Sequence, residues 1–194
     1  MFGRPKRPRI ETARITLRPP VHGDYRSWVA LRTASREFLE PWEPKWAEDH
    51  FSRKGFTNRV YWGNRSIANG SDIPLFLIRR EDQALLGAIT LSNIRRGPAQ
   101  AGTTGYWVGA SFARQGYMQE ALEAVMHHAF KVLDISRLEA GCLPENKASR
   151  GVLEAAGYKY EGVAQSYLQI GGRWRNHVLY AALRSDRRGR TEAG

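Results

Sequence analysis

Cysteine is nearly absent from this chain, which has one, Cys142, among 194 residues. A single cysteine cannot form a disulfide within the chain, which fits the reducing cytoplasm. The sequence also lacks any run of about 18 apolar residues, the length that a membrane-spanning helix needs. The basic start of the chain contains no apolar segment, so it does not form a secretory signal. We therefore predict a cytoplasmic protein with no membrane contact.

Acidic residues are few relative to basic ones. The chain has 19 Asp and Glu against 30 Lys and Arg, which gives a net charge of +11. The excess positive charge is informative about binding partners rather than about the fold. It favours binding of polyanions such as nucleoprotein or a phosphate-rich cofactor. Much of it lies near the two ends, in residues 4–9 and 184–190. These ends either contact RNA, for example on the ribosome, or are solvated tails that aid solubility.

The length is sufficient for one domain with a real core. Apolar residues make up 42% and charged residues 25%, as in ordinary globular proteins. We predict a basic N-terminal arm at residues 1–11, a single domain at residues 12–185 and a basic flexible tail at residues 186–194. The sequence leaves a monomer and a homodimer equally open.

Strand-like and helix-like segments alternate through the domain. Strands are expected at residues 14–19, 75–78, 85–92, 104–109, 138–143, 160–170 and 174–183. Helices are expected at residues 24–31, 51–67, 118–132 and 146–156. Gly157 ends the last helix, and Gly171-Gly172 forms the hairpin turn between the last two strands. Prolines at 41 and 44 keep residues 38–44 out of regular helix. The order predicts an α+β or mixed-sheet α/β domain.

The first segment that suggests a binding site is the turn between the strand expected at residues 104–109 and the helix expected at residues 118–132. The first N–H groups of a helix have no partner within it, and with the helix dipole they attract anions. Gly116 in this turn lets the backbone approach a phosphate closely, and Arg114 adds positive charge. The same pattern also occurs in turns that bind nothing.

The start of the last helix is the second such segment. Asn146 can cap this helix, and its amide can also contact a ligand beside the preceding strand. Ser149 lies three residues later, so it points to the same side. Helix capping alone would also explain both residues.

These two segments resemble motifs A and B of the GNAT acetyltransferases. The loop at residues 113–118 is similar to the Gln/Arg-x-x-Gly-x-Gly/Ala loop that cradles the pyrophosphate of coenzyme A: Gly116 matches, whereas Ala113 and Met118 depart from the pattern. Nearly the whole chain, above all residues 38–44 and 167–183, looks like the RimJ branch of ribosomal-protein-alanine N-acetyltransferases.

The resemblance implies the GNAT fold, with a mixed, mostly antiparallel sheet of about seven strands flanked by about four helices. It implies acetyl transfer from acetyl-CoA, without a metal, to a protein N-terminal amine on Ala, Ser or Thr, in a ribosomal protein. Strand N–H groups near Val108 and Gly109 would stabilise the oxyanion. The residues implied to bind acetyl-CoA are Val108, Gly109, Arg114, Gln115, Gly116, Tyr117, Met118 and Asn146.

The resemblance also suggests catalytic residues. Many GNAT enzymes use a Tyr seven residues after the motif B Asn as an acid, but here that position holds Leu153. In the RimJ branch Ser149 takes the position beside the leaving thiolate, so we expect it to act as acid or hydrogen-bond donor. The position before Tyr167, often acidic in relatives, is Ser166. Glu43 is our candidate base, although it can equally be a surface loop carboxylate.

Tyr106 and Tyr167 are candidate walls of the acceptor site, or core aromatics of their strands. The branch usually has Trp-Arg-Asp-His where this chain has Asn176 before His177. The five histidines have no metal-ligand spacing, and no metal site is predicted.

The pKa values of amines indicate which kind of acceptor suits this site. An α-amine with a pKa of about 8 is roughly one-tenth neutral near pH 7, whereas a lysine amine with a pKa of about 10.4 is almost entirely charged. A site without a strong base therefore suits a protein N-terminus. Two alternatives remain: a GNAT enzyme for a small-molecule amine, which the basic charge disfavours, and a ribosome- or RNA-binding module with a vestigial acyl-CoA site.

Overall fold

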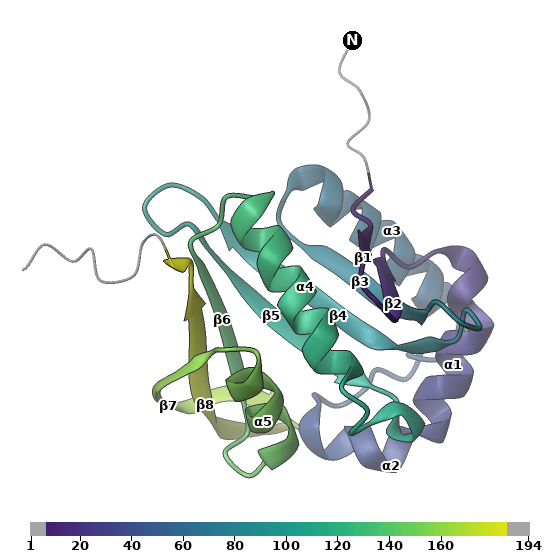
Figure 1. Ribbon diagram of the computed structural model, residues 1–194. Helices are drawn as coiled ribbons and strands as arrows, with labels where there is room; N and C mark the ends of the chain where they lie inside the picture. The colour runs from purple at the N-terminus through teal and green to yellow at the C-terminus, as the bar shows by residue number, and fades with distance from the viewer. Residues whose placement is uncertain (1–6, 186–194) are drawn as a thin grey trace, which may run out of the picture.

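Figure 1 shows the computed structural model, which describes residues 7–185. The predicted tail at residues 186–194 and the first six residues of the predicted arm lie outside the described residues. The strands are β1 Ile10–Glu11, β2 Ile15–Arg18, β3 Ile73–Arg79, β4 Leu85–Arg95, β5 Ala101–Val108, β6 Arg137–Cys142, β7 Lys159–Ile170 and β8 Arg173–Leu183. The α-helices are α1 Tyr25–Ala34, α2 Arg36–Leu39, α3 Arg53–Asn69, α4 Tyr117–Lys131 and α5 Lys147–Ala155.

The strands form one mixed sheet in the order β1-β2-β3-β4-β5-β6-β8-β7. Every pairing is antiparallel except that of β5 with β6. The predicted mixed, mostly antiparallel sheet is confirmed, with one strand and one helix more than expected within residues 7–185. The extra helix is the four-residue α2, just before Pro41. The extra strand is β1, in which Ile10 pairs with Leu17. The last two residues of the predicted arm at residues 1–11 therefore belong to the sheet.

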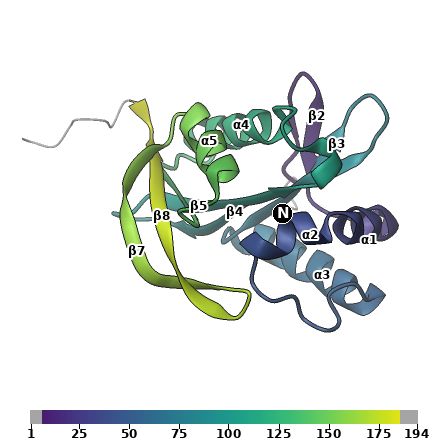
Figure 2. The same ribbon diagram turned by 90° about the horizontal axis from the view of Figure 1, so that it is seen from below.

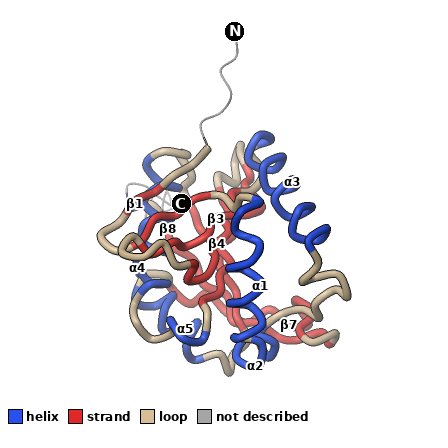
Figure 3. Tube along the Cα trace, turned by 90° about the vertical axis from the view of Figure 1, so that its right-hand side faces the viewer, coloured by secondary structure: helices blue, strands red, loops and turns tan. Residues whose placement is uncertain are grey.

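Helices cover both faces of the sheet. Figure 2 shows α4 and α5 on one face and α1, α2 and α3 on the other. Seen from the side, α1 and α3 run along the sheet over β3 and β4 (Figure 3). The chain therefore has two cores, one under each layer of helices.

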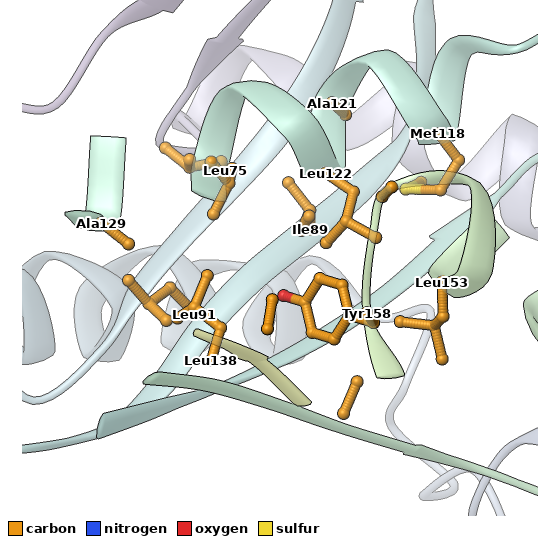
Figure 4. Packing of buried hydrophobic residues seen from close by; sticks show 14 of the residues in the cluster. Leu75, Ile89, Leu91, Met118, Ala121, Leu122, Ala129, Leu138, Leu153 and Tyr158 are labelled. Carbon is orange, nitrogen blue, oxygen red and sulfur yellow. The ribbon is translucent and has the colours of Figure 1, made fainter. Parts of the chain in front are cut away.

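The larger core lies beneath α4. Helical spacing in the sequence predicts one apolar stripe at Leu122, Val125, Ala129 and Val132; the first three are almost fully buried on α4, whereas Val132 lies just after the helix and is 65% exposed. Figure 4 shows Met118 and Leu122 reaching down toward Ile89 on β4. The smaller core holds Trp28, Phe56, Val60, Phe76, Ile78 and Leu85. Both faces of the central strands are thereby buried, which fixes the position of β5 between the two layers.

The parallel strands β5 and β6 separate soon after they begin. Only residues 101–103 pair with residues 137–139, although β5 runs on to Val108. At the fork the Thr104 hydroxyl donates to the Glu139 carbonyl oxygen at 3.2 Å and accepts from the buried Tyr158 hydroxyl at 3.1 Å. Beyond this point no backbone pairing joins β5 to β6, and we call the place where residues 104–108 of β5 have an unpaired edge the cleft.

The β7–β8 hairpin curves away from the sheet and returns toward the loop after α2 (Figure 2). Its turn uses Gly171 and Gly172 at φ 56° and 83°, values that favour glycine, so the predicted hairpin is confirmed. The Gly171 N–H donates to the Glu43 carbonyl oxygen at 3.0 Å. The hairpin therefore holds the Pro-rich loop in place beside the cleft.

Candidate active site

The open edge of β5 offers a backbone donor to a ligand in the cleft. The Gly109 N–H donates to the Leu86 carbonyl oxygen at 2.8 Å and so points toward β4. Successive N–H groups of a strand point to opposite edges, so the Val108 N–H points into the cleft, where β6 has separated. Of the two predicted oxyanion donors, only Val108 has its N–H free for this task.

The loop before α4 presents unpaired N–H groups. Arg114 and Gly116 have φ angles of 59° and 78°, which turn the chain sharply into the helix. Gly116 is the N-cap and brings no side chain to cap α4. Within residues 7–185, the N–H groups of residues 114–118 donate no hydrogen bond to the protein. Together with the positive end of the α4 dipole they fit a pyrophosphate.

The side chains of this loop contribute unequally. Tyr117 and Met118 are 9% and 6% exposed and pack into the core, so only their backbone can meet a ligand. The Gln115 amide donates to the Ser111 carbonyl oxygen at 2.9 Å. Arg114 is exposed and makes no ion pair with the described residues. Among the predicted residues of the loop, Arg114 therefore offers a free cationic side chain.

Arg14 clamps this loop, a role that the sequence did not reveal. Its guanidinium donates to Glu120 on α4 at 2.6 Å and to the Gln115 carbonyl oxygen at 2.9 Å. It also lies 4.4 Å from the centre of the Tyr117 ring. The clamp joins positions more than 100 residues apart, so no local pattern could have predicted it.

Ser149 lies at the start of α5, across the cleft from the loop. The Asn146 side chain accepts from the Ser149 N–H at 3.0 Å, so the predicted cap is confirmed. The Ser149 hydroxyl lies 3.1 Å from the Tyr106 hydroxyl. Burial raises the pKa of Tyr106, so the phenol stays protonated, and its O–H also donates to the Ser149 carbonyl oxygen at 3.2 Å. Burial also raises the pKa of the neighbouring Cys142 thiol, which keeps it neutral.

Tyr106 packs against the larger core, and its role as a wall of the acceptor site stays a prediction. Alternation along β5 turns Tyr106 toward the α4 and α5 layer, where it packs against the larger core. Its neighbour Trp107 points to the other face and packs with the smaller core. The two neighbouring aromatic residues of β5 therefore face opposite helical layers.

A pocket of about 380 Å³ lies on that other face, and its wall includes Trp107. The other lining residues are Trp28, Arg32, Glu43, Pro44, Lys45, Trp46, Ala47, His50 and Arg59. Burial, and then the charge of Arg32, lower the pKa of His50 to about 4, so this imidazole is neutral at pH 7. Indole rings and cations thus dominate a pocket that opens beside β5.

Tyr167 also lies on this face of the sheet. Its ring approaches His177 at 5.6 Å and lies beside Gly141, on the side of β6 that faces away from α5. His177 is buried, with its Nδ1 3.0 Å from the Arg175 carbonyl oxygen, in keeping with a packing role.

Ser166 and Asn176, which both differ from the residues usual in the RimJ branch, contact each other. Ser166 has a φ of 46° within a bulge of β7, and its N–H donates to the Asn176 side chain at 2.9 Å. An amide oxygen accepts this bond as a carboxylate would. Asn176 therefore supports the shape of the hairpin, and its change from Asp leaves that shape intact.

Glu43 is tied into an ion pair rather than free to act as a base. Its two carboxylate oxygens accept from the Arg32 guanidinium at 2.7 and 2.5 Å, and one also accepts from the Trp46 indole at 2.6 Å. The Arg32 side chain is 4% exposed and lies against the Trp46 and Trp107 rings at 4.4 and 4.7 Å. These contacts disfavour the predicted role of Glu43 as base and give it the role of an anchor for the loop.

Glu43→Gln should therefore lower the free energy of unfolding by about 2–4 kcal/mol, because it leaves the buried Arg32 charge without its partner. Urea denaturation measures this loss. Glu40→Gln is the matched control, since the Arg36–Glu40 pair is 57% and 49% exposed and should change stability by less than about 0.5 kcal/mol. A stable Glu43→Gln variant whose slow turnover recovers toward pH 9 would instead identify Glu43 as a base.

Two negative observations hold for residues 7–185. No group of three or more His, Cys, Asp or Glu side chains there is placed to hold a metal ion. In the same part of the chain, no helix combines the length and the apolar character needed to cross a membrane.

Comparison with known proteins agrees with this geometry. Residues 14–159 match the family model of the acetyltransferase (GNAT) domain. The [ribosomal protein uS5]-alanine N-acetyltransferase of Escherichia coli is 33% identical over 178 residues, which is 92% of either chain. The structure of Mycobacterium smegmatis RimJ with CoA-disulfide superposes with a TM-score of 0.88 at 28% identity, over 94% of this chain and 90% of that one. The ribosomal-protein-S5-alanine acetyltransferase of Vibrio fischeri gives 0.85 at 27% identity, over 92% and 98%.

Proposed function

The chain belongs to the GNAT acetyltransferase family and is an acetyl-CoA-dependent N-acetyltransferase, and from this premise we propose that its acceptor is the N-terminal amine of a ribosomal protein that begins with Ala, Ser or Thr. The similarity to the Escherichia coli enzyme over 92% of both chains is the observation that carries the acceptor class. The cleft supports it, because it offers backbone donors for a thioester but no free carboxylate as a strong base.

The donor half of the site binds acetyl-CoA through backbone groups. The pyrophosphate lies on the N–H groups of residues 114–118, held in shape by Arg14. The thioester reaches the fork between β5 and β6, where the Val108 N–H donates a hydrogen bond to its carbonyl oxygen and stabilises the developing oxyanion.

In the reaction, the neutral amine attacks the thioester carbon and a C–N bond forms. The C–S bond then breaks, and the sulfur leaves as a thiolate with the bonding electrons. The Ser149 hydroxyl donates a hydrogen bond or its proton to this sulfur, while the Tyr106 phenol, in contact with both the hydroxyl and the carbonyl oxygen of Ser149, holds Ser149 in position. The new ammonium group releases its proton to water. This last step needs no strong base, because roughly one-tenth of an α-amine is neutral near pH 7 before it binds.

The acceptor is tested with peptides whose amines differ. Peptides with a free Ala, Ser or Thr N-terminus should be acetylated at least about 10²-fold faster than the same peptides with a blocked N-terminus and an internal lysine. With free peptides, kcat/KM should rise with pH toward about 8 and then level, as the α-amine loses its proton. Mass spectrometry of the products identifies the acetylated nitrogen.

The same experiment separates the alternatives. Equal rates with blocked and free peptides would contradict the N-terminal assignment. Turnover of small amines without turnover of any peptide would identify a small-molecule acetyltransferase. Salt-sensitive RNA binding without any acetyl transfer would identify a binding module.

A further inference from the structure

The acceptor pocket carries more positive than negative charge. Glu43, its one carboxylate, is already paired with Arg32. Lys45 and Arg59 also line the pocket, and neither forms an ion pair with the described residues. In addition, the Nε of Arg32 is buried without a hydrogen-bond partner in the described chain. The pocket therefore has cations left over for an anionic group of the acceptor.

A groove of about 650 Å³ lies along α3, and Arg59 lines both this groove and the pocket. The groove runs past Trp62, which is 58% exposed, and past Arg65, whose guanidinium lies 5.3 Å from the Trp62 ring centre. Residues 53–69 contain no acidic residue. The groove offers an extended chain two cations and an aromatic surface, and its far end is bordered by Asp72.

Arg59 occupies the junction of the two hollows. Its guanidinium lies 5.0 Å from the Trp28 ring centre, which holds it over the wall of the pocket. Burial, and then the charge of Arg32, lower the pKa of Arg59, so this cation lacks full compensation from its surroundings. On the opposite side, the bond from the Gly171 N–H to Glu43 holds the wall of the pocket against the hairpin. Arg59 is therefore the cation that a peptide in either hollow can meet.

We propose that Arg59 selects acceptor peptides that carry an acidic side chain a few residues after the acetylated N-terminus. This inference rests on the proposed function and adds the chemistry of the acceptor sequence to it. A nucleic acid fits the groove less well, because Asp72 at its far end would repel a phosphate backbone running along it.

The test uses peptides with a free N-terminal Ala and with Glu, Gln or Lys placed in turn at positions 2 to 6. At one position, kcat/KM should be about three- to fivefold higher for Glu than for Gln, and lowest for Lys, as expected for a partly exposed ion pair. Arg59→Gln should remove this preference, so that the ratio of kcat/KM for the Glu peptide to that for the Gln peptide falls to about one. Arg59→Glu should shift the preference to Lys.

Arg53→Gln is the matched control. Arg53 lies on the same helix and covers the Tyr25 ring at 4.9 Å, much as Arg59 covers Trp28, but it lines neither hollow. This variant should keep the preference for Glu. The ratio of two peptides with one enzyme preparation is independent of how much of that preparation is folded.

The outcomes are distinct. If no peptide is acetylated, the proposed function itself fails. If the normal enzyme acetylates Glu, Gln and Lys peptides equally at every position, or if Arg59→Gln keeps the preference, the role of Arg59 is overturned while the proposed function stands. Inhibition by single-stranded RNA that Arg59→Gln abolishes, without any charge preference among peptides, would assign the groove to nucleic acid instead.

Discussion

Ser149→Ala should lower kcat by about 10²-fold and leave the KM for acetyl-CoA within about twofold. The hydroxyl acts on the sulfur only as the C–S bond breaks, so its loss removes an interaction of the transition state rather than of binding. The fold should not suffer, because the Asn146 cap accepts from the Ser149 N–H, which alanine keeps. Steady-state kinetics with acetyl-CoA and a free Ala peptide measures both constants.

Tyr106→Phe is the companion variant. It removes the phenol that lies 3.1 Å from the Ser149 hydroxyl but leaves the hydroxyl in place. We expect a loss in kcat of about tenfold, smaller than that of Ser149→Ala, because Tyr106 acts through Ser149 rather than on the substrate. In the double variant the two losses should not multiply, since both act on one proton donor. A normal kcat for Ser149→Ala would show that the Ser149 hydroxyl does not assist the leaving sulfur and that Ser149 is only part of the first turn of α5.

Features with a local cause were predictable from the sequence. The stripe of Leu122 and Val125 defines α4, because a helix brings residues at this spacing onto one face. Asn146 followed by Ser149 defines the start of α5, and Gly171-Gly172 defines the hairpin turn, because each depends on a few neighbouring dihedral angles. These elements differ from their predicted bounds by only one residue or so.

Features that depend on distant partners were not predictable. Glu43 looked like a free loop carboxylate because nothing near it in the sequence indicates its ion pair with the buried Arg32. Arg14 looked like an ordinary strand residue, and only the fold brings it to Glu120. The face occupied by Tyr106 likewise depends on how both helical layers pack on the sheet. In each case the missing information was tertiary packing.

The strand and helix bounds therefore locate the donor half of the site better than the acceptor half. The donor half is built from backbone N–H groups at the ends of β5 and α4, which a turn pattern reveals. The pocket that we propose for the acceptor is built from side chains of α1, α3 and the Pro-rich loop, which are far apart in the sequence and meet only in the folded chain. This difference explains why the cofactor could be assigned from the sequence and the pocket beside Trp107 could not.

Gly116→Pro should weaken acetyl-CoA binding by about 10²-fold or more. Gly116 has a φ of 78°, which proline, restricted to a φ of about −65°, cannot adopt. The substitution also removes one N–H from the loop before α4, and a hydrogen bond to a charged group is worth about 1.5–3 kcal/mol. The turn would have to rearrange, and the neighbouring N–H groups would lose their common direction toward the pyrophosphate. Isothermal titration calorimetry measures the affinity directly.

Gly116→Ala separates the backbone donor from the backbone conformation. Alanine keeps the N–H and costs about 1–2 kcal/mol at a left-handed φ. Its Cβ would lie 3.3 Å from the end of the Arg14 side chain, which can move aside. This variant should therefore bind acetyl-CoA within about tenfold of normal, and circular dichroism should show α4 intact in both variants. If the proline variant is folded and binds acetyl-CoA normally, the pyrophosphate cannot lie on the N–H groups of residues 114–118, and the cofactor must enter the β5–β6 cleft from another side.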